Sequence, residues 1–382
     1  MKRTAVLFLS FFLLFSCGEK AGKVEKSMEN GVEIILNHEQ PYKIKGEPSS
    51  FSEKEETAID FERSDLAEKG IGSVQGFDAD SEGNIFVFSG LKIFKFDKKG
   101  KFLTKFGQKG QGPGELQRIG TGRILESGEL CLYDGGNNKF LFYSPEGRFL
   151  REIKNTSNIQ IFGISGAHYL APDLFLFEEM KFNPEVEKME YHLTLLGEDF
   201  EKIEELDEKI FKENPLKSSR YNLFDYYLKY RIQDDRIYSA NQSNEYFEIT
   251  VYDTQGNITK RIRKESVKVP VPEEFKQKAF DSINDSSPVG KLLKKKGYFP
   301  KYFPPLKELY VDDKGRIFTE TYEEGTGENE LMLDIFNPEG VFTGRKSIKK
   351  AQSRKFKGGR LYALCEKDTG FQKLVVYALT WQ

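Results

Sequence analysis

A short pattern recurs six times along this chain of 382 residues. Each copy places a turn residue ahead of a polar residue, an aliphatic residue and two further strand-forming residues. The copies begin at Gly83, Gly128, Pro172, Asp235, Gly315 and Gly359. Three of the intervals between these starts are 44 or 45 residues long, and the other two, of 63 and 80 residues, are the same unit with insertions. A repeat of this length buries its apolar surface against neighbouring copies, so the packing of successive copies determines the fold.

A second pattern follows most copies, in which an aromatic residue precedes a polar turn that ends in Gly. It occurs at Phe96 to Gly100, Tyr143 to Gly147, Tyr252 to Gly256 and Phe336 to Gly340. Polar side chains open such turns by bonding to the backbone, and Gly supplies the positive φ that ends them. Each match therefore predicts a hairpin between two short strands. The third repeat has lost this Gly around residues 196–200.

The strands within one unit are apolar on both sides. Ile85 and Val87 point one way, while Phe86 and Phe88 point the other. Such a strand belongs to a sheet packed between two other sheets, and small sheets arranged radially provide that environment. A unit of about 40 to 50 residues with four strands is the period of a propeller. The sequence predicts an all-β fold, a six-bladed β-propeller of four-stranded blades.

Residues 71–116 resemble the NHL-repeat pattern, through Asp80 to Val87, Lys92 to Asp97 and Phe106 to Glu115. The whole chain resembles the bacterial six-bladed propeller lipoproteins that carry such repeats. The resemblance implies a propeller shape and a place in the cell envelope, but no particular substrate.

The N-terminus has the features of an export signal. Lys2 and Arg3 precede an apolar run over 5–15, which is too short to span a bilayer but suits a secretory signal. The run ends at Ser16-Cys17, which resembles the bacterial lipoprotein box, although Phe15 departs from it. We expect a signal peptide over 1–16 and lipid attachment at Cys17. An ordinary signal peptide with an incidental Cys is the alternative.

The region after Cys17 is polar and rich in Glu and Lys, so we expect a tether over 17–54 and the propeller over 55–382. Gly18, rather than Asp, follows the Cys and, by the usual sorting pattern of lipoproteins, favours the outer membrane.

The last repeat has room for only three strands and would leave an open sheet edge. We predict that residues 58–62 complete it, with 32–36 as the second choice.

The two long intervals contain the insertions. Pro272, followed by two Glu, is a helix-start signal, and a second short helix is expected from about Pro288. We therefore expect a helical insertion over about 270–303 between blades 4 and 5.

Tyr221, Tyr226 and Tyr227 lie in the 63-residue interval. They are candidates for an aromatic binding surface, and packing between blades is the alternative.

Oxygen-bearing side chains follow the second strand of several repeats. Propeller enzymes that resemble lactonases hold a divalent ion with such residues at the channel mouth, and Ca²⁺ would suit these donors. The candidates for this ligand or metal face are Asp134, Asn137, Asn138, Glu178, Asn241, Glu323 and Asp368. Ordinary exposed turns are the alternative reading. His38, His168 and His192 do not form a zinc-ligand spacing.

The balance of charged residues excludes some classes of function. Lys and Arg number 58 and Asp and Glu number 60, which argues against a nucleic-acid binder because that class carries a basic excess. No catalytic set stands out, so no catalytic residue or cofactor is predicted beyond the possible Ca²⁺. We favour a non-catalytic binding or scaffold module for a protein, peptide or glycan. A metal-dependent hydrolase of lactone or ester type in the propeller channel is the alternative.

Overall fold

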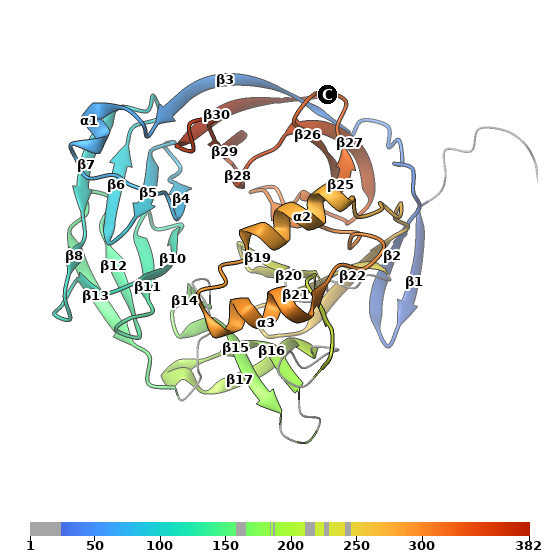
Figure 1. Ribbon diagram of the computed structural model, residues 1–382, viewed down its shortest axis with the longest axis horizontal. Helices are drawn as coiled ribbons and strands as arrows, with labels where there is room; N and C mark the ends of the chain where they lie inside the picture. The colour runs from blue at the N-terminus through green and yellow to red at the C-terminus, as the bar shows by residue number, and fades with distance from the viewer. Residues whose placement is uncertain are drawn as a thin grey trace, which may run out of the picture.

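Six sheets stand in a ring around a central axis in the computed structural model (Figure 1). The structure describes residues 24–157, 166–183, 185, 188–210, 218–224, 229–240 and 246–382. Within these residues five blades have four strands, and the fourth blade has six. The predicted six-bladed β-propeller is confirmed.

Each blade is an antiparallel meander whose first strand lies nearest the axis (Figure 1). Blade 1 consists of β4 (Gly76–Ala79), β5 (Ile85–Ser89), β6 (Lys92–Phe96) and β7 (Phe102–Phe106). Blade 2 consists of β10 (Ile119–Ile124), β11 (Leu130–Asp134), β12 (Lys139–Tyr143) and β13 (Phe149–Lys154). Blade 3 consists of β14 (Ala167–Ala171), β15 (Leu174–Asn183), β16 (Lys188–Leu196) and β17 (Lys202–Ile210).

The second half of the ring repeats this arrangement. Blade 4 contains β19 (Lys229–Gln233), β20 (Arg236–Ala240), β21 (Phe247–Asp253) and β22 (Ile258–Lys264). Blade 5 consists of β24 (Glu308–Val311), β25 (Ile317–Glu324), β26 (Glu330–Phe336) and β27 (Phe342–Lys349). Blade 6 consists of β28 (Ser353–Lys357), β29 (Arg360–Glu366), β30 (Gln372–Trp381) and β3 (Phe51–Asp60).

Short elements connect the blades. They are α1 (Ser64–Ala67), β8 (Gln108–Lys109), β9 (Glu115–Leu116), β18 (Tyr221–Asn222) and β23 (Gly297–Tyr298). The 3-10 turn η1 (Glu198–Phe200) lies within blade 3, between β16 and β17. β8 pairs with β9 between blades 1 and 2, and β18 pairs in parallel with β23.

The repeated patterns form the elements expected of them. All six copies of the first pattern lead into second strands, namely β5, β11, β15, β20, β25 and β29. The turn after β6 shows the mechanism of the second pattern: Asp97 Oδ1 accepts hydrogen bonds from the backbone N of Lys99 and Lys101, both at 2.9 Å. Gly100 then closes the turn with a φ of 76°. Local turn chemistry therefore sets the strand boundaries.

An N-terminal strand closes the ring, as predicted. β3 pairs antiparallel with β30 and supplies the fourth strand of blade 6, with Ile59 opposite Leu374. The strand covers Phe51–Asp60, so it begins earlier than the expected 58–62. Ile59 is fully buried and packs in one cluster with Phe96 of blade 1 and Val376 of blade 6. This strand therefore seals the junction between the first and last blades.

Residues 24–54 differ from the tether expected over 17–54. β1 (Glu25–Glu29) and β2 (Val32–Asn37) form a hairpin, and β2 adds in parallel to the outer strand β22 of blade 4. Ile34 and Ile35 are fully buried there. An apolar strand gains by covering a sheet edge, which explains why the segment 32–36, our second choice for closing the ring, joins blade 4 instead.

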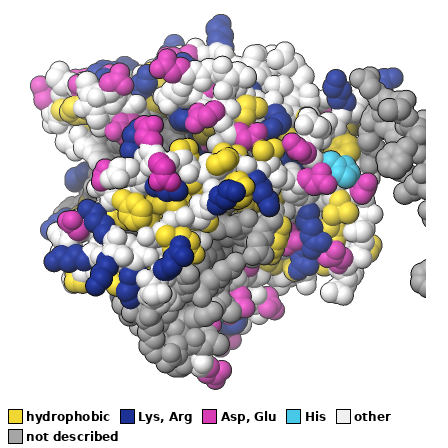
Figure 2. Space-filling view, turned by 45° about the vertical axis from the view of Figure 1, so that its right-hand side comes forward, with side chains coloured by type: hydrophobic (Ala, Val, Ile, Leu, Met, Phe, Trp, Pro, Cys, Tyr) yellow, Lys and Arg dark blue, Asp and Glu magenta, His cyan; other side chains and the backbone are white. Residues whose placement is uncertain are grey.

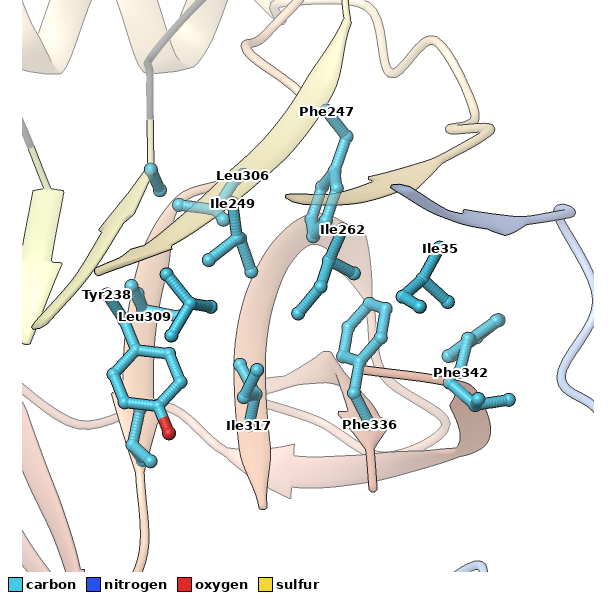
Figure 3. Close-up of a cluster of buried hydrophobic side chains, with 14 of the residues drawn as sticks. Ile35, Tyr238, Phe247, Ile249, Ile262, Leu306, Leu309, Ile317, Phe336 and Phe342 are labelled. Carbon is cyan, nitrogen blue, oxygen red and sulfur yellow. The ribbon is translucent and has the colours of Figure 1, made fainter. Parts of the chain in front are cut away.

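The interface between blades 4 and 5 shows how the blades pack (Figure 3). Ile249 and Ile262 from blade 4 face Ile317 from blade 5, and Ile35 reaches the same cluster from β2. The rings of Phe247 and Phe336 stack with centroids 5.7 Å apart. Side chains from two blades and the β1–β2 hairpin thus share one core.

The predicted helical insertion is confirmed between blades 4 and 5. α2 (Glu273–Ser282) begins directly after Pro272, and α3 (Pro288–Lys296) is capped by Ser287, whose Oγ accepts from the Gly290 N at 3.0 Å. Figure 1 shows both helices lying across the middle of the ring. Neither of them, nor any other helix in the described ranges, has the length and apolar character needed to cross a membrane.

Candidate functional site

The Asp134 carboxylate, a predicted ligand, is fully buried at the end of β11. Its oxygens accept hydrogen bonds from the backbone N of Gln117 and Arg118, both at 2.9 Å, and from Asn137 Nδ2 at 2.7 Å. Asn137 Nδ2 also donates to the Gly110 carbonyl at 2.9 Å. Both side chains thus hold the β11–β12 loop against the segment 110–118, which precedes β10. Asp134 is buried, so an ordinary exposed turn, the alternative reading, does not describe it either.

Three other candidates also have local roles. Asn138 has a φ of 54° and accepts at Oδ1 from the Tyr133 hydroxyl at 2.6 Å. Glu323 is paired with Arg345 of the same blade. Asp368 is exposed in the turn between β29 and β30. Asn241 lies outside the described residues.

The proposed aromatic surface receives no support from its first member. Tyr221 is only 1% exposed and packs with Tyr191 of blade 3 and Tyr252 of blade 4. Tyr221 therefore packs between blades 3 and 4. Tyr226 and Tyr227 lie outside the described residues, and so does Cys17.

Glu178, in contrast, belongs to a buried group of titratable side chains. Burial raises the pKa of its carboxyl to about 7, even though a hydrogen bond with Tyr230 and the charge of Lys229 act in the opposite direction. The Tyr230 hydroxyl lies 3.1 Å from His168 Nε2 on the inner strand of blade 3. The group therefore joins the inner parts of blades 3 and 4.

Ion pairs continue around the axis from this group. Glu308, on the inner strand of blade 5, lies 3.1 Å from Lys229 Nζ and 2.8 Å from Arg231 Nη2 of blade 4. Burial acts to raise the pKa of Glu308, but Arg231 and Lys229 outweigh it, so the pKa is lowered. Glu320 of blade 5 pairs in turn with Arg354 of blade 6.

An ion pair with a buried carboxylate also joins blade 6 to blade 1. Asp78 of blade 1 is 1% exposed and lies 2.6 Å from Lys355 Nζ of blade 6. Burial acts to raise the pKa of Asp78, yet Lys355 and Lys357 hold it below its usual range. Glu308, Glu320 and Asp78 are thus each matched by a cation from a neighbouring blade. Such pairs fix the relative position of the inner strands, because removing one partner leaves the other charge buried alone.

A large pocket opens beside the β1–β2 hairpin rather than at the predicted ligand face. We call it the hairpin pocket; its volume is about 840 Å³. Its walls come from the hairpin, from β21 and β22, from residues 265–268 before α2 and from residues 302–305 after β23. Figure 2 shows the side of the molecule that carries the hairpin, where apolar, basic and acidic side chains are interleaved.

Paired charges hold the wall of the hairpin pocket in place. Arg263 bonds Glu29 at 2.7 Å and Glu248 at 2.6 Å, which ties the hairpin to blade 4. His38 lies 3.3 Å from Glu25 and 3.4 Å from Glu265. The hydrogen bond with Glu25, and to a smaller extent the hydrogen bond with Glu265, raise the pKa of His38. These contacts join the hairpin to the strand that leads into the insertion.

The inner lining offers aromatic surface. Tyr246 is 48% exposed at the rim, and Lys268 lies over the Tyr302 ring with Nζ 5.9 Å from its centroid. Phe303 lines the pocket and stacks on Tyr322 at a centroid distance of 4.0 Å. Tyr302 and Phe303 lie in the segment that leads from the insertion into blade 5. Phe303 contacts that blade through Tyr322.

Sequence reasoning missed this pocket because its walls come from four separated segments. The only local signals were the aromatic residues near Pro305 and the apolar strand 32–36. Neither signal indicates that the two segments meet at blade 4.

Comparison with known proteins agrees with the architecture. A Bacteroides fragilis protein named as a candidate exported protein superposes with a TM-score of 0.50 at 12% identity, covering 91% of this chain and 99% of its own. A member of the DUF4221 family from Bacteroides vulgatus gives 0.49 at 10% identity, covering 88% and 99%. A Xanthomonas campestris gluconolactonase gives 0.43 at 12% identity, covering 81% and 87%. At 12% identity the likeness to the Bacteroides fragilis protein concerns the fold alone.

Sequence comparison gives a firmer assignment. No curated protein matches the chain. Residues 78–281, more than half of the sequence, match the family DUF5128, which is described as a 6-bladed beta-propeller. The match begins in the inner strand of blade 1 and ends within α2. The chain therefore belongs to this family of six-bladed propellers.

Proposed function

We propose that this protein is an exported, lipid-anchored binding module that takes a short peptide or glycan into the hairpin pocket. The pocket itself carries the proposal. Its volume of about 840 Å³ falls within the range of roughly 300–1,000 Å³ that is typical of ligand sites. Aromatic faces at Tyr246 and Tyr302, beside the Lys268 ammonium, suit a ligand with both apolar surfaces and hydrogen-bonding groups.

The arrangement favours binding over catalysis. Two charged groups of the pocket wall, Arg263 and His38, form ion pairs that position the β1–β2 hairpin. Asp134, Asn138 and Glu323 use their side-chain atoms on local contacts, so these three candidates lend no support to a lactonase-like ion. A binding role needs only a rigid concave surface with a few exposed aromatic groups, and the pocket supplies both.

A capture experiment with matched variants tests the pocket. The purified protein is applied to a glycan array and to a library of short peptides, together with Tyr246→Ala and Lys268→Ala. Phe371→Ala serves as the control, because Phe371 is 50% exposed but lies in the outer turn of blade 6. We expect ligands that bind the parent and the control alike, and about tenfold weaker binding to the pocket variants. Equal binding by all four proteins would place the site elsewhere.

The lipid anchor has its own test. Ser16-Cys17 after the apolar run is the motif that supports lipid attachment and export to the outer membrane. We expect the parent protein to be labelled by a fatty-acid analogue and to sediment with outer membranes, and Cys17→Ser to lose both properties. Membrane association that survives Cys17→Ser would exclude lipid attachment as its cause.

A further inference from the structure

Blade 3 brings a histidine and two glutamates together on one face of its outer strands. His192 of β16 lies directly opposite Glu208 of β17, and Thr194 lies opposite Glu205. The register shifts between these two pairs, so a bulge turns both glutamates towards the histidine. One ligand atom from each of His192, Glu205 and Glu208 lies within 4.8 Å of the others.

A third glutamate fixes the orientation of the imidazole. Glu190 Oε2 lies 3.1 Å from His192 Nε2, and Asn183 Nδ2 donates to Glu190 Oε1 at 2.7 Å. His192 and Glu190 are 6% and 7% exposed. When the ring hydrogen is on Nε2, where it faces Glu190, Nδ1 is free to present its lone pair to a metal ion. A carboxylate behind the ring is the usual support for a metal-binding histidine.

The opposite side of the ring lacks a matching hydrogen bond. Nδ1 of His192 lies 2.9 Å from Glu205 Oε1, a contact that is an ion pair when the imidazole is protonated but that lacks the alignment of a hydrogen bond. Thr194, 2% exposed and on the same face, also has a hydroxyl without a hydrogen bond among the described residues. An unprotonated Nδ1 and a carboxylate oxygen repel each other at this distance, so the contact needs either a proton on Nδ1 or a metal ion bound by both atoms.

We propose that His192 Nδ1, Glu205 and Glu208 bind a divalent transition-metal cation of the Zn²⁺ type. One imidazole and two carboxylates match the borderline preference of such ions, whereas Ca²⁺ takes oxygen ligands. Lys202 Nζ lies 3.0 Å from the second oxygen of Glu205, so it directs the first oxygen towards the metal and offsets part of the acidic charge. The site lies on the outer strands of blade 3 and does not depend on the hairpin pocket.

Zn²⁺ titration by calorimetry, on the full chain freed of metal and of any affinity tag, tests the site. We expect one equivalent to bind and to raise the Tm, since a ligand that binds only the folded state stabilises it. Glu205→Gln and Glu208→Gln should each weaken binding at least tenfold. Glu190→Gln, which acts through the ring, should weaken binding by roughly 10- to 100-fold.

A second histidine provides the matched control. His38 also lies between two glutamates but is exposed, so His38→Gln should bind Zn²⁺ as the parent does. Glu208 is exposed as well, so Glu208→Gln should leave the fold intact. X-ray absorption at the zinc edge should show a first shell of nitrogen and oxygen with one imidazole. Failure of the parent to bind Zn²⁺, or unchanged affinity in both Glu205→Gln and Glu208→Gln, would overturn the proposal.

Discussion

Lys264 of blade 4 and Asp334 of blade 5 form a buried ion pair, with Nζ 3.1 Å from Oδ2 and side chains 5% and 1% exposed. Asp334 Oδ1 also accepts from Arg345 Nε at 2.7 Å within its own blade. Asp334 thus contacts two cations at the junction beside the β1–β2 hairpin, and Glu323 pairs with the second of them, Arg345. The pairs around the axis use the same principle, so charge matching between neighbouring blades recurs in the ring.

Removal of this carboxylate should destabilise the propeller strongly. Asp334→Ala leaves the buried Lys264 without its counter-charge, while Arg345 keeps Glu323, and breaking a buried pair in this way costs about 3–5 kcal/mol. Lys264→Met should cost less, because Arg345 still neutralises Asp334. Urea unfolding measures both changes. A larger loss for Lys264→Met than for Asp334→Ala would contradict this account of the junction.

Glu178 should make stability depend on pH. The pKa of its carboxyl is raised from 4.5 to about 7 in the folded protein by burial, so the folded state favours the protonated form. The stability from this group is complete below about pH 4.5 and is lost as the pH rises towards 7. Glu178→Gln keeps the neutral shape, and we expect it to exceed the parent by up to about 3 kcal/mol at pH 8.

The two proteins should become nearly equal in stability at about pH 4.5, where the parent carboxyl is protonated in the folded state. Urea unfolding at both pH values gives the difference, and the comparison cancels the titration of all other groups. A difference that stays constant across this range would show that Glu178 does not carry the pH dependence.

The closing strand offers a prediction on packing. Ile59 of β3 is fully buried between blades 6 and 1, so Ile59→Ala should cost about 2–5 kcal/mol. Glu55 in the same strand is exposed, and Glu55→Ala should change stability by less than about 0.5 kcal/mol. Thermal unfolding of the two variants compares them directly. Equal and small effects would mean that the strand contributes little to the ring.

Local turn chemistry explains why the fold was predictable. A residue such as Gly100 or Asp97 determines a turn through contacts within a few positions, so the hairpins and the blade count could be read from the sequence. Pro272 marked a helix start for a similarly local reason. Asp134 occupies the position after a second strand that suggested a ligand, but its carboxylate accepts from the backbone of residues 117 and 118, a contact that the local sequence does not reveal.

The sites depend on contacts between distant segments. The hairpin pocket needs His38 beside Glu265, and the proposed metal site needs a bulge that turns Glu205 and Glu208 to the same side. Strand periodicity alone would place these two glutamates, three positions apart, on opposite faces. No spacing in the sequence reveals such a bulge, and His192 therefore did not stand out as a ligand.

Residues 32–37 and 51–60, which precede the first repeat, are part of the propeller: β2 forms a wall of the hairpin pocket and β3 closes the ring. Amide hydrogen exchange followed by mass spectrometry measures whether both segments belong to its sheets. We predict that peptides covering 32–37 and 51–60 exchange as slowly as those from β21 and β22, because their backbone groups are bonded within sheets. Exchange of both segments at the rate of an unstructured chain would contradict the claim.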